Sequence, residues 1–134
     1  MIKLIIHSDG GSRNNPGEAA IGVVIANEKG EVITTISKRL GIATNNQAEY
    51  QGVIAGLEKA QEMKADEVEC VLDSELVVKQ LNREYKVKHK DLAPLFLKMH
   101  NLSSHFKKVT FRHVRREYNK EADRLVNEAL DAIE

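Results

Sequence analysis

The sequence predicts one α/β domain, with a mixed five-stranded sheet and helices on both of its faces. Three β-rich apolar runs lie in the first 40 residues, before any helical spacing begins. After them, stretches with helical periodicity alternate with short apolar runs, which is typical of strand–helix units. The chain has 134 residues and 42% hydrophobic content, enough for one domain with a real core. We therefore treat residues 1–134 as a single domain.

The first three strands are expected to form an antiparallel meander. Residues 2–9, IKLIIHSD, make a β-rich apolar run. Residues 19–40, AAIGVVIANEKGEVITTISKRL, are read as two strands. The segment Asn27-Glu28-Lys29-Gly30 joins them and suits a hairpin connection with its glycine at the end.

The first helix is predicted from Thr44 to about Glu62. Thr44-Asn45-Asn46-Gln47 fits a capping box, in which Thr and Gln side chains bond the backbone at the helix start. An apolar stripe at helical spacing supports the assignment. The stripe consists of Tyr50, Val53, Ile54, Leu57 and Ala60.

Two more strands and three more helices complete the chain. Strands are expected at 67–72 and 109–114, and short helices at 74–82 and 91–104. The last helix begins near Asn119, and its apolar stripe is Ala122, Leu125, Val126, Ala129, Leu130 and Ile133. Because these strands alternate with helices, they should join the sheet in parallel through right-handed crossovers.

Composition excludes several classes of protein. The formal net charge is zero, so the chain lacks the overall basic excess of a strongly cationic nucleic-acid binder. No apolar run is long enough to span a membrane, and the N-terminus lacks a signal-peptide pattern, so no membrane partner is expected. The single cysteine, Cys70, lies in a predicted buried strand, which suits a cytoplasmic protein. Lys86, Lys88 and Lys90 form either a solvated face or a basic patch.

Four acidic residues stand at positions that can meet. Asp9 ends the first predicted strand and Asp73 ends the fourth, while Glu49 and Asp123 lie in the first turns of two helices. Ligands of open α/β sheets bind beyond the carboxyl ends of parallel strands. If the first and fourth strands are parallel neighbours, Asp9 and Asp73 lie together there.

Each acid also has an ordinary explanation. Asp9 before two glycines suits a turn, and Asp73 before Ser74 suits a helix N-cap. On the same kind of explanation, Glu49 would only complement the dipole of its helix, and Asp123 would be a solvated surface acid. Jointly, four converging carboxylates would repel one another without a cation, and such oxygen clusters suit Mg²⁺ or Mn²⁺. Two such ions clamp an in-line displacement at phosphorus.

Four segments resemble the signatures of the type 1 ribonuclease H family. They are DGGS at 9–12, TNNQAE at 44–49, DS at 73–74 and NKEAD at 119–123. The resemblance covers nearly the whole chain and implies the RNase H-like fold, in the compact archaeal or bacterial form without a basic protrusion. It implies a two-metal endonuclease that cuts the RNA strand of an RNA/DNA hybrid and leaves 5′-phosphate and 3′-hydroxyl ends. The implied metal and catalytic residues are Asp9, Glu49, Asp73 and Asp123.

The resemblance also implies substrate contacts. Backbone and small polar groups would read the RNA 2′-hydroxyl, which distinguishes RNA from DNA. These groups belong to Gly10, Gly11, Ser12, Asn14 or Asn15, and Asn46. Thr44 and Asn45 match the family's contacts to a DNA-strand phosphate. Many members carry a histidine in the loop before the last helix, which this chain lacks. Arg116 resembles an arginine of compact members: either it assists catalysis by stabilising phosphate charge, or it is an exposed arginine near a helix start.

Several departures from the family bear on binding. Ile42 stands where the family often has an arginine, the region 82–91 is short, and the chain has no tryptophan. These differences predict weaker hybrid binding and a weaker dependence on salt than in larger members. Two other functions remain open from the sequence: a different metal nuclease on this fold, such as a resolvase or a double-stranded RNA cutter, and a hybrid-binding module without turnover. A monomer is expected.

Overall fold

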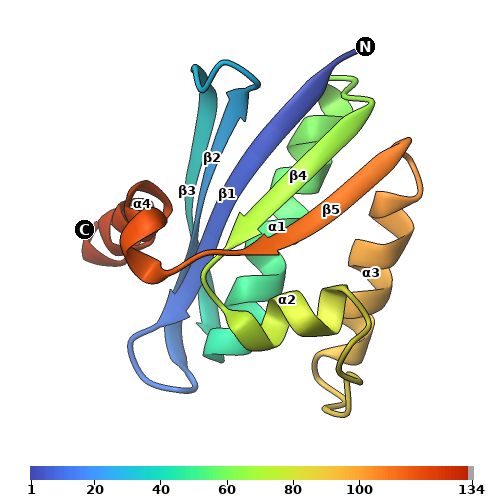
Figure 1. The fold of residues 1–134 in the computed structure, drawn as a ribbon. Helices are drawn as coiled ribbons and strands as arrows, with labels where there is room; N and C mark the ends of the chain where they lie inside the picture. The colour runs from blue at the N-terminus through green and yellow to red at the C-terminus, as the bar shows by residue number, and fades with distance from the viewer. Residues whose placement is uncertain (133–134) are drawn as a thin grey trace.

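The computed structural model describes residues 1–132 and contains the predicted elements in the predicted order (Figure 1). The strands are β1 (Lys3–Ser12), β2 (Gly17–Asn27), β3 (Val32–Ala43), β4 (Glu67–Leu72) and β5 (Lys108–His113). The helices are α1 (Asn45–Glu62), α2 (Glu75–Leu81), α3 (Ala93–Ser103) and α4 (Lys120–Asp131), with a 3₁₀ turn, η1 (Arg116–Tyr118), before α4. Ile133, the last member of the predicted α4 stripe, lies outside the described residues.

The five strands form one mixed sheet in the order β3-β2-β1-β4-β5. β1, β2 and β3 pair antiparallel, which confirms the predicted meander. β4 pairs parallel with β1, and β5 pairs parallel with β4, which confirms that both later strands join the sheet in parallel.

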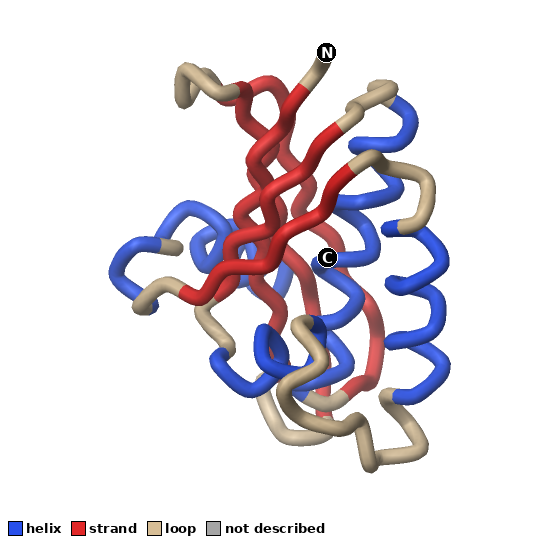
Figure 2. Tube along the Cα trace, turned by 45° about the vertical axis from the view of Figure 1, so that its right-hand side comes forward, coloured by secondary structure: helices blue, strands red, loops and turns tan. Residues whose placement is uncertain are grey.

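Helices cover both faces of the sheet, as Figure 2 shows from the side. Successive β2 residues face opposite helices: Val23 points toward α1, and Gly22 lies against α4. The main core lies between the sheet, α1 and the α2–α3 region, and Ile6, Tyr50 and Leu57 are fully buried in it. A smaller cluster joins Ala20 of β2 to the apolar stripe of α4.

The start of α1 is fixed by the predicted capping box. Thr44 Oγ1 accepts from the Gln47 backbone nitrogen at 3.1 Å, and Gln47 Oε1 accepts from the Thr44 backbone nitrogen at 2.8 Å. Two backbone donors that would otherwise lack partners are thereby satisfied. The cap defines where α1 begins beside β1, and therefore where Glu49 lies.

The prediction that Asp9 ends the first strand was wrong. β1 continues through Gly10 and Gly11 to Ser12, because these residues pair with Ile21, Ala20 and Ala19 of β2. What ends near Asp9 is the parallel pairing with β4, whose last pair with β1 is His7–Val71. Asp9 therefore lies just beyond the last β1 residue that pairs with β4. The bounds of β4 are as predicted, and boundaries elsewhere shift by at most three residues, as helix and strand ends commonly do.

None of the helices in residues 1–132 is both long and apolar enough to cross a membrane.

Candidate active site

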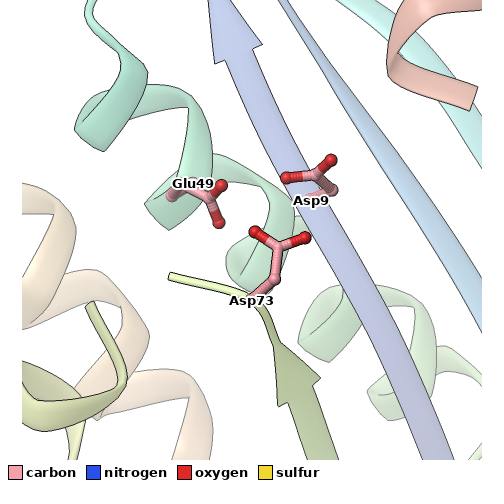
Figure 3. Close-up of side chains that lie close together, drawn as sticks. All are labelled: Asp9, Glu49 and Asp73. Atoms are coloured by element: carbon pink, nitrogen blue, oxygen red, sulfur yellow. The ribbon is translucent and has the colours of Figure 1, made fainter. Parts of the chain in front are cut away.

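Three carboxylates meet at the carboxyl end of the parallel strands. Asp9 in β1, Glu49 in α1 and Asp73 directly after β4 each place one oxygen within 4.8 Å of the others. Figure 3 shows the three side chains turned toward one another. The parallel β1–β4 pair meets the condition that the sequence analysis set for Asp9 and Asp73 to lie together.

Two glycines allow both helices to approach Asp9 closely. A Cβ at Gly10 would lie 2.2 Å from the Ala48 carbonyl oxygen, so only glycine lets β1 touch the first turn of α1. Gly22 is the β2 partner of Asp9, and a Cβ there would lie 2.1 Å from the Ala122 carbonyl oxygen of α4. Glu49 and Asp123 are thus carried to the two sides of Asp9.

Asp123 lies on the wall of the same cleft, although it is not one of the three residues within 4.8 Å. It is half-buried in the first turn of α4. Its carboxylate interacts with Asp9 and contributes to raising the pKa of Asp9. The structure therefore brings together three of the four predicted acids tightly and the fourth at the edge.

Burial and mutual repulsion disfavour the charged forms of the two most buried acids. Burial, together with the negative charge of Asp73, raises the pKa of Asp9 to about 7. Burial is also the main cause that raises the pKa of Glu49 well above its usual range, and the charge of Asp9 adds to it. The backbone N–H of Gly10 partly opposes this for Asp9, since it donates to Asp9 Oδ1 at 2.9 Å.

The site fits a divalent cation. Glu49 Oε2 is buried and has no hydrogen-bond partner among the described residues, which is costly unless another ligand satisfies it. The donors are carboxylate oxygens, the ligands that Mg²⁺ and Mn²⁺ prefer. A cation would also remove the repulsion that disfavours the charged forms of Asp9 and Glu49.

Besides the turn expected at Asp9, the ordinary explanations for Asp73 and Glu49 do not hold. Ser74, not Asp73, caps α2, because its side chain accepts from the Val77 backbone nitrogen at 3.3 Å. Glu49 is only 6% exposed, so it is not a surface charge complementing the α1 dipole.

A cleft of about 440 Å³ surrounds the acids, and it is lined by several predicted contact residues. These are Gly10, Gly11, Ser12, Asn45 and Asn46. Arg116, from η1, also lines the cleft and is exposed. Arg13 is a lining residue that the sequence analysis missed. It is tied to the end of α4 by an ion pair with Asp131.

The remaining predicted contacts lie beside this cleft. A smaller hollow of about 200 Å³ is lined by Asn15, Thr44, Asn46, His89, Asp91 and Leu92, so Asn46 borders both spaces. Asn45 connects the two groups, because its Oδ1 accepts from the Ser12 backbone and its own backbone donates to Asn15 Oδ1. Asn14 is exposed and lines neither space. His89 and Asp91 carried no signal in the sequence.

Asn119 is a further residue beside the site whose role the sequence analysis missed. It was noted only as part of a motif, yet its side chain donates to Asp73 Oδ2 at 3.1 Å and to the Ser8 carbonyl at 2.9 Å. Its position directly before α4 was the only available signal, because both partners are remote in sequence.

Known proteins share both the sequence and the fold. A family model described as reverse transcriptase-like matches residues 7–129. The bifunctional protein Rv2228c of Mycobacterium tuberculosis is 44% identical over 132 residues, which are 98% of this chain and 36% of that protein. Ribonuclease HI of Halobacterium salinarum is 42% identical over 123 residues, 92% of this chain and 62% of that protein. The chain thus spans about a third of the first relative's length and less than two thirds of the second's.

Solved structures of RNase H1 proteins share the fold of this chain. RNase H1 from Halobacterium salinarum superposes with a TM-score of 0.95 at 39% identity, covering 98% of this chain and 99% of that one. LC11-RNase H1, which was isolated from compost, was solved in complex with an RNA/DNA hybrid. That complex gives a TM-score of 0.90 at 45% identity, with 96% of each chain covered.

Fold and carboxylate cluster place the chain among reverse transcriptase-like domains of the RNase H-like class. Within that class, the full-length match to RNase H1 narrows the assignment. The chain belongs to the type 1 ribonuclease H family.

Proposed function

We propose that the chain is a metal-dependent endonuclease that hydrolyses the RNA strand of RNA/DNA hybrids. The products would carry 5′-phosphate and 3′-hydroxyl ends. The observation that carries the proposal is the cluster of Asp9, Glu49 and Asp73 in an open cleft. The LC11-RNase H1 complex, which holds an RNA/DNA hybrid on a closely similar fold, supports the choice of substrate.

The four acids would hold two Mg²⁺ ions when substrate is bound, and Mn²⁺ is a possible substitute. When bound, the ions supply an activated water and stabilise charge on the leaving oxygen. Asp9 is central to the site, because the side chains of both Glu49 and Asp123 interact with its carboxylate. The protein's own contribution is to hold these oxygens together despite their repulsion, so that no reorganisation is needed during the reaction.

Substrate contacts would extend from the acids in two directions. Gly11, Ser12 and Asn46 line the same cleft as the acids, so a strand bound at the acids would lie beside them. Gly10 is also on this wall, although its main constraint is packing against α1. We assign RNA contacts to these residues and to Asn14 or Asn15, and DNA-strand contacts to Thr44 and Asn45 at the α1 N-terminus.

Arg116 is proposed as an auxiliary residue. Its guanidinium carries a permanent charge at the rim of an acidic cleft. It would stabilise negative charge that develops on the phosphate during cleavage.

We further propose that residues 1–134 form one domain that acts as a monomer in the cytoplasm. Buried Cys70 is in keeping with a reducing compartment. Double-stranded RNA is a second possible substrate, because it shares the 2′-hydroxyl groups of the RNA strand.

A substrate panel tests the proposal. One 5′-labelled RNA strand is presented alone, paired with DNA and paired with RNA, in Mg²⁺, in Mn²⁺ and in chelator. We expect metal-dependent cutting of the DNA-paired strand, and its loss in Asp73→Asn. Absence of cutting by folded protein in either metal would overturn the proposal, and retained hybrid binding would then indicate a binding module.

A further inference from the structure

We propose that Asn119 is a positioning residue that holds the Asp73 carboxylate in the orientation needed to bind a cation. The inference rests on the proposed metal-dependent function. Asn119 contacts no substrate. It acts through its hydrogen bonds to the Asp73 carboxylate and to the backbone of Ser8 and Asp123.

The first argument is the contact itself. Asn119 Nδ2 donates to Asp73 Oδ2 at 3.1 Å, and the other Asp73 oxygen remains available to the cluster. Asp73 follows the end of β4 and is half-buried, and among the described residues its carboxylate accepts no other hydrogen bond. A hydrogen bond to one oxygen limits rotation of the carboxylate and presents the other oxygen in a defined direction.

The second argument is burial. Asn119 is 2% exposed, and both of its Nδ2 acceptors, Ser8 O and Asp73 Oδ2, belong to the site region. Two acceptors on one nitrogen determine which way the amide faces. Its Oδ1 is buried and has no donor at normal hydrogen-bond geometry among residues 1–132, although the His7 side chain also interacts with Asn119.

The third argument is that one residue connects three of the four acids. The Ser8 carbonyl that accepts from Asn119 directly precedes Asp9 in β1. The Asn119 carbonyl accepts from the Asp123 backbone nitrogen at 3.1 Å, in the first turn of α4. Asn119 therefore ties β1, the end of β4 and the start of α4 to one another at the site.

The test compares Asn119→Ala with a control of similar burial, Gln80→Ala. Gln80 is 6% exposed and accepts from the Tyr50 hydroxyl at 2.7 Å, and it does not line the acidic cleft. Both variants remove one buried amide. Asn119→Ser, whose hydroxyl cannot reach both acceptors, replaces the alanine variant if that variant fails to fold.

Three quantities are measured: Mn²⁺ affinity by calorimetry, kcat and KM on an RNA/DNA hybrid, and thermal unfolding in chelator. We expect Asn119→Ala to weaken Mn²⁺ binding about 10- to 100-fold, the range for removing a partner of a metal ligand. We expect its kcat to fall with little change in KM at limiting metal. Gln80→Ala should unfold at a lower temperature yet keep the wild-type Mn²⁺ affinity.

Equal Mn²⁺ affinity in wild type and Asn119→Ala would overturn the positioning role. So would an equal loss of Mn²⁺ affinity in the Gln80 control, because that would reflect general destabilisation. Failure of the wild type to bind Mn²⁺ at all would instead contradict the proposed function on which the inference rests.

Discussion

Removing the charge of Asp9 should stabilise the protein without metal while it abolishes activity. Asp9 is 5% exposed, and burial raises its pKa to about 7 from an ordinary value of 3.8. A carboxyl whose pKa is raised by folding stabilises the folded state fully below its unfolded pKa. That contribution is lost as the pH rises through the folded pKa, here about 7.

The magnitude follows from the same two values. A rise of about 3 pH units corresponds to about 4 kcal/mol between the two protonation states. This is an upper bound for the gain in Asp9→Asn at pH 8, because the new amide must find acceptors in a buried site. Below about pH 4 Asp9 is protonated in both states, so the gain should vanish there.

Urea unfolding in chelator, followed by circular dichroism at about pH 8 and about pH 5, measures this difference. Asp9→Asn should be more stable than wild type at the higher pH, and the gap should narrow at the lower pH. Glu28→Gln, at an exposed residue of the β2–β3 hairpin, should have the same free energy of unfolding as wild type at both pH values. A variant that is no more stable than wild type at pH 8 would refute the reasoning about buried repulsion.

Three further outcomes follow from the site and its supports. Gly10→Ala should lower the free energy of unfolding by more than 2 kcal/mol and weaken Mn²⁺ binding, because its Cβ would overlap the Ala48 carbonyl; wild-type stability in urea would contradict this. Thr44→Ala should cost about 1 kcal/mol in the same measurement, since it removes the capping box, and an unchanged midpoint would show that the cap is dispensable. Mg²⁺ should raise the melting temperature more at about pH 8 than at about pH 5.5, because protons compete with the cation for Asp9 and Glu49; calorimetry showing equal shifts would exclude these acids as its ligands.

Local patterns predicted most of the fold. The apolar stripe and capping box of α1 are local in sequence, and the structure confirms both. The alternation of strands and helices predicted that β4 joins the sheet in parallel. Its pairing with β1, which the sequence left as a condition, brings Asp9 and Asp73 together. Such features depend on residues within one element, or on the order of elements.

The errors and omissions arise from long-range contacts. Gly10 and Gly11 signalled a turn, yet pairing with β2 keeps them in β1. The hydrogen bond from Asn119 to Asp73 spans 46 residues, and its bond to Ser8 spans 111, so no local pattern could predict either. The need for glycine at position 22 likewise depends on α4, which lies about 100 residues later in the chain.

The chemical nature of the cut ends tests the central claim most directly. Mass spectrometry would identify the ends formed when the protein acts on an RNA/DNA hybrid in Mg²⁺, with chelator as the control. Cleavage by water at a metal–carboxylate site predicts 5′-phosphate and 3′-hydroxyl ends, and none in chelator. Ends that carry a 2′,3′-cyclic phosphate and a 5′-hydroxyl, formed equally in chelator, would mean that the RNA 2′-hydroxyl attacks instead. That result would contradict a role for Asp9, Glu49 and Asp73 as a hydrolytic metal site.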